Sequence, residues 1–143
     1  YIFQEERLLP WYTVEQNIHF VLKGHYEREE ILERTAKALE LVDLKDFSKH
    51  FPHELSGGMK QRVSFARAFA YGGEMIIMDE PFKGLHRELK FALMDYVKNY
   101  YLQNHPYLVF VTHDQEEAMY LGDKLYYLSG PPLFVERVEV KTI

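Results

Sequence analysis

A run of four apolar residues, Met75–Met78, constrains the fold of this 143-residue chain more than any other segment. Because every residue in it is apolar, the run predicts a central parallel strand that is covered on both faces of its sheet. Two carboxylates, Asp79 and Glu80, follow it directly. Parallel strands need crossover connections, and helical patterns stand on both sides of the run. We therefore expect an α/β fold in which Asp79 and Glu80 lie at the carboxyl end of the sheet, where ligands bind.

Periodicity and capping signals predict the other elements. A capping box at Thr13–Gln16 and a glycine at Gly24 bound one helix, and Ser56 and Asp114 begin others. Further helices are expected at about 27–44 and 86–104, a second buried strand at 108–112, and a closing pair of strands at 124–128 and 133–140. Between about 10 and 55 the patterns are helical only, which predicts a helical subdomain beside the sheet.

The segment Leu55–Arg62 reads LSGGMKQR and opens an apolar and basic helix. Ser56 offers a hydroxyl, and Gly57 and Gly58 have no Cβ, so backbone N–H groups there can approach a ligand closely. The helix adds unpaired N–H groups and the positive end of its dipole, which together suit a phosphate. An isolated Ser-Gly-Gly would be interpreted as a plain loop.

The carboxylates at the strand end can divide the chemical work between them. One can hold Mg²⁺ through oxygen, while the other orients or deprotonates an attacking water. A structural capping pair is the alternative interpretation. His113, at the end of the next strand, is by itself more often a core or cap residue than a catalyst. His50 and His53 are separated by Pro52 and lack matching ligands nearby, so we expect no metal site there.

Taken together, LSGGMKQR, the strand that ends in Asp79-Glu80 and the segment Val111–Asp114 resemble the signature motif, Walker B strand and switch histidine of ATP-binding-cassette (ABC) ATPases. The resemblance covers nearly the whole chain. It implies an incomplete P-loop NTPase (RecA-like) parallel sheet with an inserted α-helical subdomain. It also implies that residues of about 10–70 form the signature subdomain, whereas 1–9 and 71–143 belong to the catalytic core.

The resemblance assigns a role to each site residue and names ATP and Mg²⁺ as cofactors. Glu80 corresponds to the catalytic base, His113 to the switch histidine that contacts the γ-phosphate, and Gln4 to the Q-loop glutamine that reaches toward Mg²⁺ and the water. Asp79 is the Mg²⁺ ligand. The residues expected at the nucleotide are Ser56, Gly57, Gly58 and Gln61.

Two departures from the family pattern matter. The family's D-loop usually ends in Leu-Asp, whereas Gly84 and Leu85 are followed here by His86, so the aspartate that links the two active sites is replaced. No G-x-x-x-x-G-K-[ST] phosphate-binding loop, the Walker A motif, occurs in the 143 residues. We therefore expect the chain to correspond to the C-terminal part of a nucleotide-binding domain and to be inactive alone.

The segment Gln4–Asn17 resembles the Q-loop region of importer ATPases, particularly those that serve nitrate, sulfonate and taurine uptake. This implies the ATP-binding subunit of an ABC importer on the cytoplasmic face of the cell membrane. Its implied partners are a second nucleotide-binding domain, arranged head to tail, and a transmembrane permease subunit that contacts Leu9, Pro10 and Trp11. A net charge of −5 argues against nucleic acid. The alternatives are a non-enzymatic interaction module and a non-transport ABC ATPase.

Overall fold

The computed structural model describes residues 1–141, which form two compact units, Tyr1–Val111 and a second unit that begins at Thr112. The first unit contains α1 (Val14–Leu22), α2 (Arg28–Leu41), α3 (Gly57–Tyr71), β1 (Met75–Asp79), α4 (Arg87–Asn104) and β2 (Tyr107–Val111), with two short 3-10 turns, η1 (Lys45–Phe47) and η2 (Pro52–Glu54). The second unit contains α5 (Gln115–Leu121), β3 (Lys124–Ser129) and β4 (Phe134–Val140).

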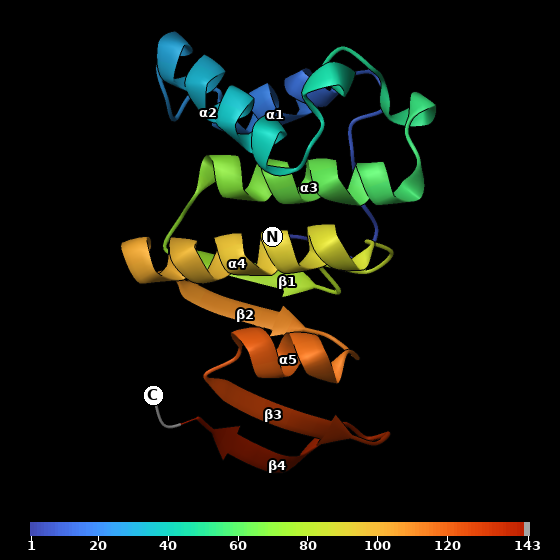
Figure 1. Cartoon of the computed structure of the whole chain (residues 1–143), viewed down its shortest axis with the longest axis vertical. Helices are drawn as coiled ribbons and strands as arrows, with labels where there is room; N and C mark the ends of the chain where they lie inside the picture. The colour runs from blue at the N-terminus through green and yellow to red at the C-terminus, as the bar shows by residue number, and fades with distance from the viewer. Residues whose placement is uncertain (142–143) are drawn as a thin grey trace. The chain divides into compact units, whose positions relative to one another are not determined.

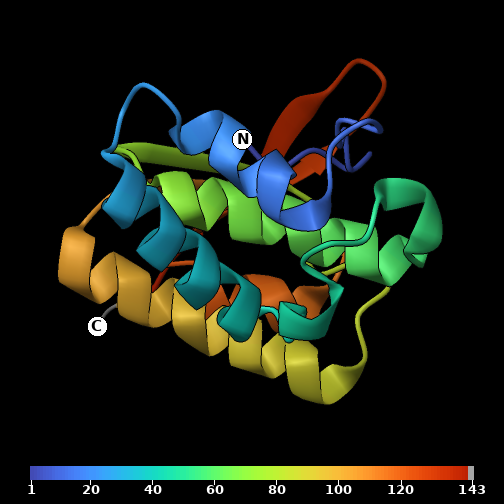
Figure 2. The ribbon, with the colours of Figure 1, turned by 90° about the horizontal axis from the view of Figure 1, so that it is seen from above.

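Helix α3 is the centre of the first unit. Helices α1 and α2 lie together on one side of it, and α4 runs along it with the sheet (Figures 1 and 2). Aromatic rings join α3 to α4, with the ring of Phe69 5.4 Å from that of Tyr96 and 5.2 Å from that of Tyr100. Burial raises the pKa of both tyrosine hydroxyls. The core of this unit is therefore built around α3.

The capping signals place the helix starts correctly, and one helix end differs from expectation. The capping box between Thr13 and Gln16 is present at α1, and Gly24 has a φ of 87° just beyond its end. Helix α2 ends at Leu41 rather than near residue 44. Asp43 takes a left-handed φ of 53°, and the N–H of Leu44 donates to the carbonyl of Leu39 at 2.9 Å, which closes the helix.

The sheet of the first unit is parallel, as predicted, but less buried than predicted. Strand β1 pairs in parallel with β2, and on its other side Ile2 forms a parallel bridge with Met78. Met75 is 56% exposed, so β1 is not covered along both faces. In β2, Val109 and Val111 are each about half exposed, which makes the expectation of a buried strand wrong. Exposure alternates along β2 because successive side chains point to opposite faces.

The second unit confirms the predicted cap and the closing pair of strands. The Asp114 carboxylate accepts hydrogen bonds from the N–H groups of Glu116 and Glu117 and so caps α5. Strands β3 and β4 are antiparallel, with Lys124 opposite Val140. Among residues 1–141, no helix combines the length and the apolar character needed to cross a membrane.

Candidate functional site

The signature segment forms an open helix N-terminus. Ser56 is the N-cap of α3, and its Oγ accepts a hydrogen bond from the N–H of Met59 at 3.2 Å. Gly57 is the exposed first residue of the helix, and a Cβ added there would meet nothing within 4 Å. The first turn of α3 therefore presents backbone N–H groups and the positive end of the dipole without a covering side chain.

The two carboxylates lie where β1 turns out of the sheet. The N–H of Asp79 still donates to the carbonyl of Ile2 at 2.8 Å, and that of Glu80 to the carbonyl of Val111 at 2.9 Å. Glu80 has a φ of 49°, a left-handed conformation that is uncommon for a residue with a side chain and concentrates at functional sites. Gln4, exposed, follows Ile2 by two residues, so it leaves the same carboxyl edge as Asp79 and Glu80.

The loop after Glu80 lies against the signature helix. A Cβ added to Gly58 would stand 3.5 Å from the Gly84 carbonyl oxygen. The buried Gln61 side chain donates from Nε2 toward the carbonyls of Glu80 and Pro81, both at 3.4 Å. The structure thus pairs the Gln61 amide with this loop. The contact of Gln61 with nucleotide stays a prediction. Residues of the signature thus support the backbone that carries Glu80.

The middle of α3 holds the segment that follows Gln4. Ser64 Oγ donates to the Glu6 carbonyl at 2.5 Å, and the Arg67 guanidinium donates to the carbonyls of Arg7 at 3.1 Å and Glu6 at 3.3 Å. Burial lowers the pKa of Arg67, and the guanidinium remains charged at neutral pH. One helix therefore contacts both the Q-loop segment and the loop after Glu80. The sequence analysis did not predict these contacts of Ser64 and Arg67. Two polar residues on the inner face of an apolar helix nevertheless indicate buried hydrogen bonds.

An aromatic surface stands beside the Q-loop segment. Pro10 and Trp11 are exposed, the latter by 67%, whereas Leu9 is half-buried. The Trp11 ring contacts that of Tyr12 at 6.5 Å between centroids, and Tyr12 in turn lies 5.8 Å from Phe20 of α1. Phe20 is 54% exposed and was not predicted. Large exposed aromatic side chains grouped in this way are typical of a contact surface for another protein.

The predicted D-loop residues lie at the start of α4. Gly84 has a φ of 74°, and the N–H of Leu85 donates to the carbonyl of Phe82 at 3.3 Å. His86 is the exposed N-cap of α4, and its side chain makes no capping hydrogen bond. The position that usually carries aspartate in the family is thus a helix cap that the imidazole does not fill.

His113 belongs to the second unit and is exposed. Its neighbours are fixed by a small network, in which Thr112 Oγ1 donates to the buried Glu117 carboxylate at 2.6 Å and accepts from the N–H of Asp114 at 3.0 Å. The backbone on both sides of His113 is therefore held in place. The role of His113 at a γ-phosphate stays a prediction.

A sequence profile described as ABC transporter matches residues 1–83. The chain belongs to the ABC transporter family. It is 39% identical over 140 residues to an aliphatic sulfonates import ATP-binding protein of Bacillus cereus, covering 96% of this chain and 54% of that protein. It is 38% identical over 137 residues to a nitrate import ATP-binding protein of Synechocystis, with 95% and 52% covered. The chain thus spans about half the length of these relatives.

A solved structure supports the same assignment at the level of the fold. A dimeric ATP-binding cassette, bound to ADP and Pi in a post-hydrolysis state, matches 97% of this ABC chain with a TM-score of 0.87 and 31% identity. The match covers 61% of that cassette. The predicted α/β P-loop NTPase fold is therefore confirmed.

Proposed function

We propose that this chain belongs to the ATP-binding subunit of an ABC importer, which couples ATP binding and hydrolysis to solute transport, and that it supplies the signature to one ATP site and the carboxylates Asp79 and Glu80 to another. One observation carries the proposal. The first turn of α3 is open at Gly57, and at Gly58 and Gln61 it lies against the loop that follows Asp79 and Glu80. The similarity to sulfonate and nitrate import ATP-binding proteins supports the transport part.

The residues fit ATP and Mg²⁺ by their chemistry. A helix N-terminus with exposed amides and no Cβ at Gly57 suits a phosphate group. The Asp79 carboxylate and the Gln4 amide oxygen are ligand types that Mg²⁺ prefers, and both follow parallel segments that end at one edge. Residues 1–141 hold no cluster of three or more acidic, histidine or cysteine side chains that could bind a metal.

Each side chain then has a distinct task. Bound Mg²⁺ would neutralise charge on the phosphates. Glu80, turned out of the strand by its left-handed backbone, accepts a proton from the attacking water. Gln4 orients the water by a hydrogen bond, and the contact of His113 with the γ-phosphate rests on the family resemblance alone. Gln61 acts through the loop that it supports, in addition to any contact with nucleotide.

The proposed dimer follows from the motifs that the 143 residues contain. Ser56, Gly57 and Gly58 contact a γ-phosphate that a Walker A loop holds, and no such motif occurs in the 143 residues. In a head-to-tail dimer that loop belongs to the second nucleotide-binding domain, so Ser56, Gly57 and Gly58 serve the ATP of that domain. Asp79, Glu80 and Gln4 serve the ATP held by their own domain. The exposed surface at Leu9, Pro10 and Trp11 receives the permease subunit, which places the protein on the cytoplasmic face of the membrane.

The test is Glu80→Gln in the complete gene product that contains these residues, reconstituted with its permease. Loss of the general base lowers ATP hydrolysis by about 10²–10⁴-fold while ATP binding is kept. Glu29→Gln, an exposed glutamate in the first turn of α2, is the matched control and leaves hydrolysis unchanged. Hydrolysis that survives Glu80→Gln would contradict the assigned chemistry. Turnover that ignores the permease would favour a non-transport ABC ATPase.

The 143 residues by themselves contain no G-x-x-x-x-G-K-[ST] loop, so we expect the isolated chain not to bind ATP. Calorimetry with MgATP checks it, and the expected result is no measurable binding heat. Micromolar affinity for ATP in the isolated chain would contradict this interpretation.

A further inference from the structure

Asn17 is a completely buried polar residue in the second turn of α1, and its side chain faces the loop that carries Trp11. It is 0% exposed, with the buried residues Val14 and Ile18 beside it in the helix. Its Oδ1 accepts a hydrogen bond from the N–H of Leu9 at 2.8 Å. Its Nδ2 lies 3.2 Å from the Leu9 carbonyl, 3.1 Å from that of Tyr12 and 3.0 Å from that of Thr13.

Only a carboxamide of this length can make these contacts. The two Nδ2 protons are shared among three carbonyl oxygens, while Oδ1 meets the one N–H group, so the orientation of the amide is settled by its partners. A carboxylate would turn an oxygen toward the three carbonyls. A glutamine would be one methylene too long for the same buried space. The loop is also closed by a turn, in which the N–H of Tyr12 donates to the Leu9 carbonyl at 3.1 Å.

We infer that Asn17 is a positioning residue that fixes the loop Leu9–Thr13, so that Trp11 stands at its tip as a preformed docking surface. Buried polar groups are costly unless they are paired, and here all the pairing goes to one loop. A loop that is ordered in advance avoids the entropy cost of ordering on association. The inference rests on the proposed function, in which this surface receives the permease.

The test uses the intrinsic fluorescence of Trp11, the single tryptophan of the 143-residue chain. In Asn17→Ala the loop is released, so the anisotropy of Trp11 falls and its quenching by acrylamide rises. Hydrogen exchange of the Leu9 amide accelerates about tenfold, the factor that corresponds to one lost hydrogen bond. A folded Asn17→Ala chain with unchanged anisotropy and unchanged Leu9 exchange would overturn the inference.

Two further variants separate positioning from general stability. Gln16→Ala removes a neighbouring side chain that caps α1 through Thr13 without contacting Leu9, so Trp11 anisotropy stays as in the parent chain. Asn17→Asp keeps the acceptor for Leu9 but not the donor for the carbonyls. It therefore preserves Leu9 protection and still lowers the anisotropy. Equal loss of anisotropy in Gln16→Ala would contradict a specific role for Asn17.

The unmodified chain gives an independent check if the Asn17 variants fail to fold. In the unmodified chain we expect the Leu9 amide to exchange its hydrogen as slowly as the amides within α1. Exchange of the Leu9 amide at the rate of an unstructured loop would overturn the inference. None of these measurements involves a permease, so their failure leaves the proposed function standing.

Permease-stimulated hydrolysis in the complete gene product tests whether the permease docks at the loop that Asn17 fixes. Asn17→Ala raises the permease concentration needed for half-maximal stimulation, and an unchanged value contradicts docking at this loop.

Discussion

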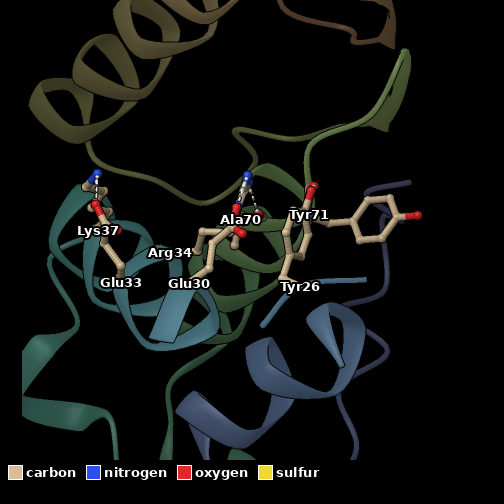
Figure 3. A network of polar contacts seen from close by, with 7 residues as sticks. All are labelled: Tyr26, Glu30, Glu33, Arg34, Lys37, Ala70 and Tyr71. Atoms are coloured by element: carbon tan, nitrogen blue, oxygen red, sulfur yellow. Dashed lines mark hydrogen bonds and ion pairs between the residues drawn. The ribbon is translucent and has the colours of Figure 1, made fainter. Parts of the chain in front are cut away.

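The two ends of α3 are built in opposite ways. At its C-terminal end, the Arg34 guanidinium donates to the Ala70 carbonyl at 3.1 Å, and the Tyr26 hydroxyl donates to the Tyr71 carbonyl at 2.7 Å (Figure 3). At its N-terminal end only the Ser56 hydroxyl provides a cap, and the residues that follow are glycines. Both ends carry backbone groups without partners inside the helix. Side chains from outside the helix pair the carbonyls, whereas at the N-terminal end Ser56 pairs the Met59 amide and the exposed Gly57 leaves its part of the turn uncovered.

The contrast indicates how one helix serves both structure and function. The Arg34 guanidinium also lies over the Tyr26 ring at 3.9 Å and pairs with Glu30 at 2.8 Å, so the segment from Tyr26 into α2 is locked onto the end of α3. Because the C-terminal end of α3 is fixed in this way, its open N-terminal end can be held in one position against the loop after Glu80.

The largest effect is expected at the closed end. Arg34→Met removes the charged donor from the Ala70 carbonyl and lowers the free energy of unfolding by about 2 kcal/mol. The neighbouring variant Lys37→Met is the control, because its ion pair with Glu33 lies on the exposed face of the same helix and contributes little (Figure 3). Urea denaturation followed by circular dichroism measures both. Equal stability losses would contradict the account of the closed end.

A smaller effect is expected where the D-loop meets α4. His86→Asp places a carboxylate at a cap that makes no side-chain hydrogen bond, which raises the free energy of unfolding by about 1 kcal/mol. The matched variant His105→Asp puts the same change at the C-terminal cap of α4, where the helix dipole opposes it. Thermal melting compares the two. A stability loss in His86→Asp would show that the imidazole has a structural role at this position.

The smallest stability effect is expected at the open end. Gly58→Ala meets only ordinary contact with the Gly84 carbonyl and raises helix propensity, so stability rises by about 0.5 kcal/mol or less. ATP hydrolysis by the complete gene product nonetheless falls, because the added methyl group stands between the signature helix and the loop that follows Glu80. Gly84→Ala is the control that loses stability, since its φ of 74° is strained for alanine. Full activity in Gly58→Ala would contradict close approach there.

Local signals account for what the sequence predicted well. The caps at Thr13 and Asp114, the helix start after Ser56 and the parallel pairing of β1 with β2 rest on short patterns, and the structure confirms them. The exposure of Val109 could not be predicted, because an apolar strand does not reveal which of its faces is covered.

The contacts that organise the site were also beyond local patterns. Ser64 and Arg67 reach backbone groups at Glu6 and Arg7 that lie 58 to 61 positions away in the chain. Gln61 was predicted to bind nucleotide from its place in a motif, and its pairing with the loop after Glu80 depends on how α3 packs beside β1. Such pairings are decided by tertiary structure, which residue spacing within one element does not encode.

The most direct test of the central claim is ATP-dependent dimerisation of the complete gene product carrying Glu80→Gln, followed by sedimentation velocity. A second change, Gly57→Asp, fits the open space at the start of α3 and suits the helix dipole, yet it places a negative charge where the phosphate binds. Arg28→Asp, at the first residue of α2, is its control. The account predicts a dimer with MgATP that Gly57→Asp abolishes without loss of thermal stability. An ATP-driven dimer that persists in Gly57→Asp would contradict it.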